Sequence, residues 1–366
     1  MNTTKTILFN PGPVMPSERV RQSLIRDDIC HRGPEFMELF ADTVMKINKL
    51  FKANDDYQSL IISGSGTSAN ETVLSSIFGK DDAVLLVTNG VFGERLEEII
   101  DKHEVKKYVA RFDWGQQVDP AVVEEMLAKH PEITAVAMVY HETSTAMINK
   151  VKEVGAIAKK MNRIYFVDAI SAGAGEDIDV IDQQIDIITS VGGKALGAYP
   201  GSAYVCARKT ILDGLKAENC KTVYLNLYKH YQIAIKNNQT PNTPNVTLIF
   251  ALNEALTEYL ENPSAKLDRY VACSTMLREG LKKMGLKFFL PESEMSNTVT
   301  SVLMPKNVDV LAFIDALEAD ERYVVYSGKG PLLEVHNMLQ VANMGEIYPA
   351  DCELFLKAFE RQLAKA

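Results

Sequence analysis

The chain has 366 residues, 46% of them hydrophobic and 24% charged, and 48 acidic side chains against 39 basic ones give a formal net charge of −9. This length can bury the core of one large domain and a smaller one, and the composition is that of a globular protein without low-complexity tracts. Because the balance is acidic and no basic stripe stands out, neither a nucleic acid nor an anionic membrane is an expected partner.

The N-terminal segment leads through Lys5 into a short apolar run at 7–9 and then into Pro11-Gly12-Pro13. No long apolar h-region and no run of 18 apolar residues occurs, so we expect neither a signal peptide nor a membrane span. Residues 14–50 are typical of two helices rather than of strands. We expect this N-terminal segment to pack with the C-terminal part of the chain.

Between residues 58 and 207, short apolar segments alternate with helical patterns. The segments 59–63, 83–88, 135–140, 164–167, 185–190 and 202–206 are nearly continuous in apolar residues, as parallel strands covered on both faces are. Helices are expected between them, at 120–130 behind an Asp119 N-cap and at 151–161, where apolar residues recur every three to four positions. This alternation predicts an α/β domain with a mostly parallel sheet.

Beyond residue 262 the pattern changes. We expect a helix at 266–284, a strand at 298–304, a helix at 310–317, a strand at 323–326 and a final helix at 350–363. Fewer strands with different neighbours predict a second, smaller α+β domain. The expected division is a large domain of residues 21–262 and a small domain made of residues 1–20 and 263–366.

The five cysteines are odd in number, widely scattered and without CxxC spacing. This pattern argues against a disulfide framework and against a zinc site, so we expect no metal ion. It fits a reducing compartment, and we expect a cytoplasmic protein.

A glycine-rich turn, Ser63-Gly64-Ser65-Gly66-Thr67, follows the first predicted strand and opens a helix. Free backbone N–H groups, the positive end of the helix dipole and the hydroxyls favour an anion such as phosphate. The turn lacks the Gly-Lys-Ser/Thr of a Walker A loop and the third glycine of a dinucleotide fingerprint. A plain turn with a Ser/Thr cap is the alternative interpretation.

Two further residues stand where ligands bind in open α/β sheets. Asp168 ends the predicted strand 164–167, where a buried carboxylate is costly unless it meets a cation, although it could also simply cap a helix. Lys194 follows the strand 185–190 directly after two glycines, and by itself it could be a surface lysine in a turn. Together with the turn, they supply the three anchors that pyridoxal 5′-phosphate (PLP) needs, for phosphate, ring nitrogen and aldehyde.

Motifs along nearly the whole chain resemble those of the class V, fold-type I family of PLP-dependent aminotransferases. The resemblance is to the branch of alanine/serine–glyoxylate and 2-aminoethylphosphonate–pyruvate aminotransferases. The matching stretches are Asn10-Pro11-Gly12-Pro13, His31-Arg32-Gly33-Pro34, Gly64-Ser65-Gly66-Thr67, Asn89-Gly90-Val91-Phe92-Gly93, His141-Glu142-Thr143-Ser144-Thr145, Val167-Asp168-Ala169, Lys194, Thr240-Pro241-Asn242-Thr243-Pro244 and Ser296-Asn297-Thr298-Val299-Thr300. The resemblance implies an α/β fold with a seven-stranded type of sheet, mostly parallel, and a smaller C-terminal α+β domain.

The resemblance also implies how the cofactor would be bound. Ser65, Gly66 and Thr67 would hold the phosphate. Phe92 would stack on the pyridine ring, and Thr143 would hydrogen-bond the ring hydroxyl.

The catalytic roles and the quaternary structure follow from the same resemblance. Asp168 would keep the ring nitrogen protonated. Lys194 would carry the cofactor as a Schiff base and, once displaced by substrate, move the proton as general base and acid. Thr243 matches a family threonine that reaches the phosphate of a neighbouring subunit, so a homodimer with shared active sites is expected.

The sequence departs from the family in two places. Gly193 stands where Gln or Asn often precedes the lysine, which removes a donor near the phosphate. Gln340 stands where relatives carry the arginine that grips the substrate carboxylate, a difference of about 1.5–3 kcal/mol in carboxylate affinity. Arg32 or Lys329 could supply the missing charge, although Lys329 could equally be an exposed turn lysine. A shifted alignment at Gln340 is the alternative.

The leading hypothesis is a transaminase that moves an amino group from a small donor to a 2-oxo acid such as pyruvate or glyoxylate. Candidate donors are 2-aminoethylphosphonate, alanine, serine and phosphoserine. The alternative on the same fold is a PLP-dependent lyase that catalyses β-elimination. A cysteine desulfurase is disfavoured because no cysteine occurs between Cys273 and Cys352. If the chain were a binding protein without a cofactor, the joint occurrence of Lys194, Asp168 and the glycine-rich turn would be a coincidence.

Overall fold

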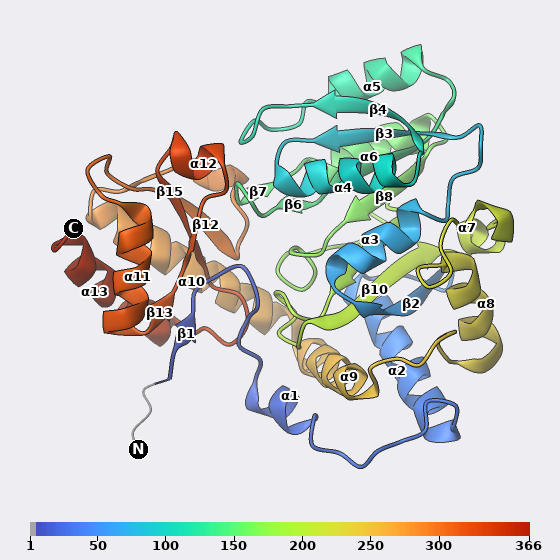
Figure 1. Cartoon of the computed structure of the whole chain (residues 1–366), viewed down its shortest axis with the longest axis horizontal. Coiled ribbons are helices and arrows are strands. Elements are labelled where there is room, and N and C mark those ends of the chain that lie inside the picture. The colour runs from blue at the N-terminus through green and yellow to red at the C-terminus, as the bar shows by residue number, and fades with distance from the viewer. Residues whose placement is uncertain (1–4) are drawn as a thin grey trace.

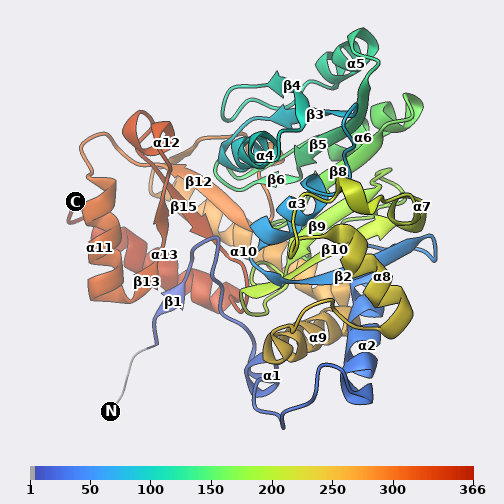
Figure 2. The ribbon, with the colours of Figure 1, turned by 45° about the vertical axis from the view of Figure 1, so that its right-hand side comes forward.

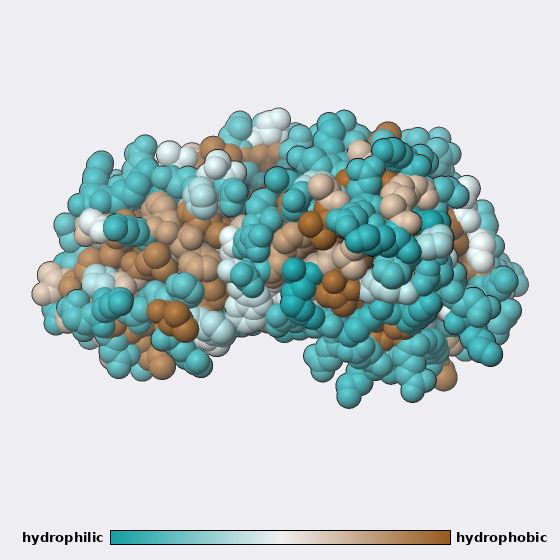
Figure 3. All heavy atoms as spheres, turned by 90° about the horizontal axis from the view of Figure 1, so that it is seen from above, coloured by the Kyte–Doolittle hydropathy of each residue, from teal (hydrophilic) through white to brown (hydrophobic). Residues whose placement is uncertain are grey.

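The computed structural model describes residues 5–366 as two lobes (Figure 1). The first four residues lie outside the described part. They belong to the predicted small domain and to the stretch in which we expected no signal peptide. Seen from above, the lobes stand side by side with a narrower waist between them, and the surface of the larger one is mostly hydrophilic (Figure 3). Within residues 5–366, no helix is both long and apolar enough to cross a membrane.

A seven-stranded sheet with the order β2-β10-β9-β8-β5-β3-β4 forms the centre of the larger lobe. Its strands are β2 (Tyr57–Gly64), β3 (Ala83–Thr88), β4 (Lys106–Arg111), β5 (Ile133–Val139), β8 (Ile164–Asp168), β9 (Ile187–Val191) and β10 (Gly201–Arg208). Only β10 runs antiparallel to its neighbours. Every residue of β3 is buried, as expected for a strand covered on both faces. The predicted α/β class and mostly parallel sheet are confirmed.

The strand β4 was not among the predicted strands. It is the edge of the sheet, and three of its six residues, Lys106, Lys107 and Arg111, are charged. An edge strand faces solvent along one side, so it lacks the continuous apolar run by which the other strands were found. The antiparallel direction of β10 was likewise invisible, because an apolar run carries no information on direction.

Helices surround this sheet, with α3 on one side of β2 and β10 and with α2 and α9 on the other (Figure 2). They are α1 (Glu18–Gln22), α2 (Pro34–Leu50), α3 (Gly66–Leu74), α4 (Val91–Lys102), α5 (Pro120–Lys129), α6 (Val151–Lys160), α7 (Lys209–Asp213), α8 (Leu227–Asn237) and α9 (Val246–Glu261), with a 3₁₀ turn at Ala217–Asn219. The predicted cap of α5 is present, since Asp119 accepts a hydrogen bond from the backbone N–H of Ala121 at 3.0 Å. A short hairpin of β6 (His141–Glu142) and β7 (Met147–Ile148) follows β5.

The smaller lobe contains a four-stranded antiparallel sheet with the order β11-β12-β15-β14. Its elements are α10 (Pro263–Lys283), β11 (Lys287–Phe288), β12 (Val299–Leu303), α11 (Val310–Glu321), β14 (Tyr326–Ser327), α12 (Pro331–Glu334), β15 (Met338–Ala342) and α13 (Pro349–Leu363), with a 3₁₀ turn at Glu292–Glu294. The predicted strand 323–326 is divided, because β13 (Tyr323–Val324) pairs instead with the N-terminal β1 (Ile7–Leu8). Strand β15, at the centre of the sheet, was not predicted.

The N-terminal segment belongs to both lobes. Phe9 stacks on Phe355 of α13 with ring centroids 4.2 Å apart, so the chain begins in the smaller core. Val20, in α1, lies in the larger core together with Phe36 and Phe40 of α2. The change of lobe therefore falls close to residue 20, and the division of the chain at residues 20 and 262 stays a prediction.

Candidate active site

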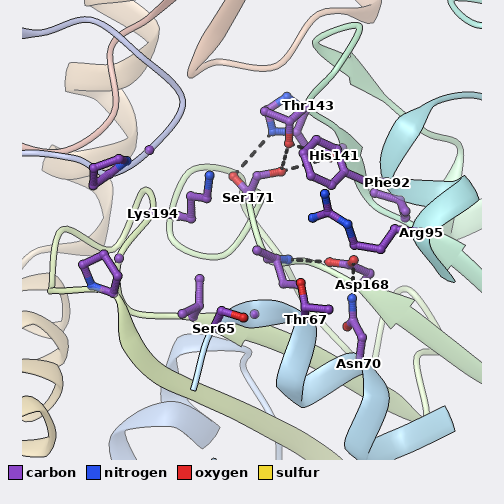
Figure 4. A pocket seen from close by; sticks show the side chains of 18 of the residues that line it. Ser65, Thr67, Asn70, Phe92, Arg95, His141, Thr143, Asp168, Ser171 and Lys194 are labelled. Carbon is purple, nitrogen blue, oxygen red and sulfur yellow. Dashed lines mark hydrogen bonds between the residues drawn. The ribbon is translucent and has the colours of Figure 1, made fainter. Parts of the chain in front are cut away.

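A cavity of about 330 Å³ lies at the ends of the central strands (Figure 4). Gly12 and Pro13 of the N-terminal segment also line it. Strands β5, β8 and β9 end at it, and α3 and α4 begin beside it, as expected for the carboxyl edge of a parallel sheet. Seven predicted site residues line this cavity: Ser65, Gly66, Thr67, Phe92, Thr143, Asp168 and Lys194.

The glycine-rich turn forms the N-terminus of α3. Ser65 is the N-cap residue, and its hydroxyl makes no capping hydrogen bond, so it is available to a ligand. A Cβ atom on Gly66 would come within 2.6 Å of the Ile170 side chain, so any larger residue would require Ile170 to shift. The free N–H groups of this first turn face the cavity, which suits an anion of the size of a phosphate.

Asp168 ends β8 and is held by two hydrogen bonds. Its Oδ1 accepts from the backbone N–H of Ile170 at 2.9 Å, and its Oδ2 accepts from Asn70 Nδ2 at 2.7 Å. Asn70 is fixed in turn by the hydroxyl of Thr189, which donates to its Oδ1 at 2.6 Å. Burial raises the pKa of Asp168 to about 6, while the hydrogen bonds and the charges of Arg95 and Lys194 act against the rise. A cation brought to this buried carboxylate would stabilise its charged form.

Lys194 follows β9 in a tight turn, and its Nζ donates a hydrogen bond to the carbonyl oxygen of Pro11. Burial, followed by the charges of Lys329 and Arg95, lowers the pKa of Lys194 to about 8. A larger fraction of this amine is neutral near pH 7 than for an ordinary lysine, which makes it a better nucleophile. A Cβ on Gly12 would lie 2.5 Å from Nζ, so the lysine passes directly over this glycine.

The departure at Gly193 has a steric reason. A Cβ atom at this position would lie 2.6 Å from the backbone nitrogen of Pro200 and 2.8 Å from its Cα. Those are backbone atoms and cannot move aside as a flexible side chain can. A Gln or Asn side chain, which the resemblance led us to expect, does not fit here while the loop at Pro200 keeps its path.

Helix α10 holds the turn that carries Lys194. The Tyr270 hydroxyl donates to the carbonyl oxygen of Ala195, and Lys266 Nζ donates to that of Leu196 at 2.5 Å. Burial lowers the pKa of Lys266 to about 8. These two donors come from the helix that enters the smaller lobe, so the position of Lys194 depends on contacts that no local motif indicates.

The His141-Glu142-Thr143 segment forms the wall opposite the α3 turn (Figure 4). Thr143 Oγ1 donates to Ser171 Oγ at 2.5 Å, and that hydroxyl donates to the carbonyl oxygen of His141 at 3.0 Å. Glu142 accepts from the backbone N–H groups of Phe92 and Gly93 at 3.1 and 3.0 Å, which fixes the start of α4. Burial lowers the pKa of His141 to about 3, so its imidazole is neutral.

Four predicted site residues do not line the cavity. Arg32 donates to Gln239 Oε1 and to the carbonyl oxygens of residues 240 and 241 at 2.7–3.0 Å. Thr243 lies on the surface, with its Oγ1 3.4 Å from His31 Nε2. Gln340 is buried in β15 and donates through Nε2 to the carbonyl oxygens of residues 143 and 144.

Lys329 approaches the cavity without lining it. Its Nζ lies 5.1 Å from the centroid of the Phe92 ring.

The cavity also contains residues that the sequence pattern did not single out. Arg95, Asn70 and Ser171 line it, and Arg95 lies with Cζ 5.0 Å from the centroid of the Phe92 ring. The spacing of Arg95 three residues after Phe92 could have indicated it, since residues three apart share a helix face. Asn70 and Ser171 carried no such signal, because their roles depend on strands that meet only in the fold.

Comparisons with known proteins agree with this geometry. The family model described as aminotransferase class-V matches residues 19–344. An uncharacterized aminotransferase of Methanocaldococcus jannaschii is 32% identical over 94% of this chain and 89% of that protein. A 2-aminoethylphosphonate–pyruvate transaminase of Lysinibacillus sphaericus is 28% identical over 97% of each chain. The crystal structure of ureidoglycine–glyoxylate aminotransferase from Bacillus subtilis superposes with a TM-score of 0.91 at 25% identity, covering 100% of this chain and 94% of that one.

The fold and the cavity define a PLP-dependent enzyme of fold type I: the N-terminal turn of a helix, a buried carboxylate that has no salt bridge within residues 5–366 and a lysine of lowered pKa line a single cavity. The chain belongs to the class V aminotransferase family, and it is a transaminase.

Proposed function

We propose that this transaminase moves the amino group of a small donor to a 2-oxo acid such as pyruvate or glyoxylate, and that Lys194 bonds covalently to the cofactor. The observation that carries the proposal is the convergence of Lys194, Asp168 and the α3 turn on one cavity. The names of similar proteins support the acceptors, since one is called an aminoethylphosphonate–pyruvate transaminase and another a ureidoglycine–glyoxylate aminotransferase.

Each part of the cofactor has a proposed partner among these residues. Ser65, Gly66 and Thr67 bind the phosphate through hydroxyl and backbone N–H donors. Phe92 would cover one face of the ring, and the Thr143 oxygen would accept a hydrogen bond from the ring hydroxyl while its own proton is donated to Ser171. When bound, PLP supplies an electron sink for the charge that develops at the carbon bearing the amino group.

Asp168 and Lys194 would act on the ring nitrogen and on the reacting carbon. Asp168 keeps a proton on the ring nitrogen, and Asn70 holds its carboxylate in the required orientation at 2.7 Å. Lys194 would hold the cofactor through its aldehyde group. As a free amine it would act as the general base and acid that moves the proton at the substrate carbon, a task suited to a pKa of about 8.

We also propose a homodimer in which Thr243 reaches the cofactor phosphate of the other subunit. Thr243 is exposed and outside its own cavity, as a residue acting in a neighbouring site must be. Mixing inactive Lys194→Ala chains with Thr243→Ala chains tests this arrangement. Shared sites predict that the mixture regains activity above that of either variant alone, and no gain at any mixing ratio contradicts it.

Half-reaction spectroscopy tests the transaminase. With a donor, the cofactor absorbance should change to that of its aminated form, and it should return when pyruvate or glyoxylate is added. The panel contains 2-aminoethylphosphonate, alanine, serine and phosphoserine. No change with any donor would overturn the proposal. Release of a 2-oxo acid without an acceptor would identify the β-eliminating lyase instead.

A further inference from the structure

The segment Asn10-Pro11-Gly12-Pro13 has no role in the function proposed above, although it touches the reactive lysine. It connects β1 to α1, and Gly12 and Pro13 line the cavity. The Lys194 Nζ donates a hydrogen bond to the carbonyl oxygen of Pro11. The ribbon of this segment lies on the Lys194 side of the cavity (Figure 4). The segment therefore meets the free amine of Lys194 directly.

Both ends of this segment are anchored to the smaller lobe. The carbonyl oxygen of Phe9 accepts a hydrogen bond from the backbone N–H of Ala342 at 2.8 Å. The carbonyl oxygen of Met15 accepts one from the backbone N–H of Glu346, also at 2.8 Å. Residues 10–14 therefore form an arch whose two ends are held by contacts that do not involve the lysine.

Asn10 fixes the shape of the arch where it meets the lysine. Its Oδ1 accepts a hydrogen bond from the backbone N–H of Gly12 at 3.0 Å, which closes an Asx turn around Pro11. Asn10 is only 2% exposed, so water has little access to this bond. The ring of Pro11 restricts its own φ angle. Together these constraints set the direction in which the Pro11 carbonyl points.

Gly12 leaves the space through which the lysine passes. Its φ of 122° lies in the region that favours glycine, and a Cβ atom there would lie 2.5 Å from Nζ and 2.9 Å from Cδ of Lys194. Within residues 5–366, the Pro11 carbonyl is the one hydrogen-bond acceptor that Nζ meets. The direction of that carbonyl therefore decides how the free amine is oriented.

We propose that Asn10 is a positioning residue for Lys194: by holding the Pro11 carbonyl in place, it orients the free amine for proton transfer at the substrate carbon. This inference rests on the proposed role of Lys194 and adds the group that orients it. A neutral amine has two N–H bonds and one lone pair, so a hydrogen bond through one N–H restricts where the lone pair points. A proton acceptor held in a reactive geometry works faster than one that must first find it.

The pH dependence of cofactor attachment tests the proposal without turnover. Full-length apoenzyme of the wild type, Asn10→Ala and Asn10→Ser is mixed with PLP, and the rate of attachment is followed by absorbance over a pH series. A carbonyl that accepts from the protonated amine stabilises it, so the midpoint for Asn10→Ala should move downward by about half a pH unit or more. Asn10→Ser should recover part of this shift, because a serine hydroxyl closes the same turn more weakly.

Asn54→Ala is the matched control. Asn54 closes the same kind of turn on the surface, where its Oδ1 accepts from the backbone N–H of Asp56 at 3.1 Å. Its removal should leave the midpoint at the wild-type value.

Kinetics of the holoenzyme should agree with this result. Asn10→Ala should lower kcat about tenfold with little change in KM, because the proton carrier is misplaced while the substrate contacts remain. A donor deuterated at the reacting carbon should give a larger kinetic isotope effect with Asn10→Ala than with the wild type.

An unchanged midpoint in Asn10→Ala would overturn the proposal, and so would an upward shift, which would mean that the segment only keeps water away from Lys194. If Asn10→Ala does not fold, Asn10→Ser decides, since its weaker turn predicts a smaller downward shift and the absence of any shift contradicts it. Failure of the proposed function is distinguishable, because PLP would then not attach to Lys194 in the wild type at any pH.

Discussion

The two halves of the active site are built differently. The cofactor half uses strand ends and turns of one lobe: Ser65 begins α3, Asp168 ends β8, and Lys194 follows β9. Beside it, cations from both lobes approach the Phe92 ring, Arg95 from α4 and Lys329 from the segment after β14, and we expect the substrate half to be assembled there. We therefore expect the chemistry to be encoded in short segments and the specificity to depend on how the two lobes meet.

Lys194→Ala should have the largest effect and acts on the cofactor half alone. Loss of the nucleophile and proton carrier should lower kcat by about 1000-fold or more and remove the visible absorbance of covalently bound PLP. The measurement is single-turnover kinetics together with an absorbance spectrum. Lys152→Ala, which removes a surface lysine paired with Asp182 at 2.8 Å, is the control. A Lys194→Ala spectrum identical to the wild type would contradict the assignment.

Asp168→Asn should have the next largest effect. The amide keeps the shape and can still bond to Asn70, but it removes the charge that would hold a proton on the ring nitrogen. We expect kcat to fall by about 100-fold, with a smaller change in KM, as for loss of one preorganised electrostatic group. Steady-state kinetics with a fixed cofactor content measure this. A change in KM alone would assign Asp168 to binding instead.

The pKa of Lys194 depends on charged residues of both lobes. Its lowered pKa predicts that the rate at which the apoenzyme attaches PLP rises with pH around a midpoint near 8, rather than near the value of a free lysine. Because the charge of Lys329 lowers this pKa, Lys329→Gln should move the midpoint upward. Stopped-flow absorbance over a pH series measures both midpoints, and Lys306→Gln is the control. Identical midpoints in the wild type and Lys329→Gln would show that the charge of Lys329 does not affect the pKa of Lys194.

Gln340→Leu should have the smallest effect on turnover and should act on stability. It leaves the carbonyl oxygens of residues 143 and 144 without their donor, which should cost about 1–3 kcal/mol in the free energy of unfolding. Urea denaturation measures this loss, and Gln340→Glu distinguishes lost hydrogen bonds from lost shape. A large rise in KM without destabilisation would place Gln340 against the substrate.

Much of the fold followed from the apolar pattern. Six of the central strands were predicted because each is buried on both faces, whereas β4 was missed because Lys106, Lys107 and Arg111 give an edge strand a polar composition. In the smaller lobe, β15 was missed because the polar Gln340, whose amide is satisfied by the other lobe, interrupts its apolar run. A local pattern cannot indicate a partner that is almost 200 positions away.

The same division holds for the active site. The sequence by itself determined the segments that we propose for cofactor binding, because each is a turn or a strand end whose geometry is set by a few adjacent residues. Only the tertiary structure decided that Arg95 and Lys329 converge on Phe92, that Arg32 and Gln340 are engaged elsewhere, and that α10 holds the Lys194 turn. Those contacts join residues far apart in the chain, and electrostatic and packing energies between them depend on distances that no local pattern contains.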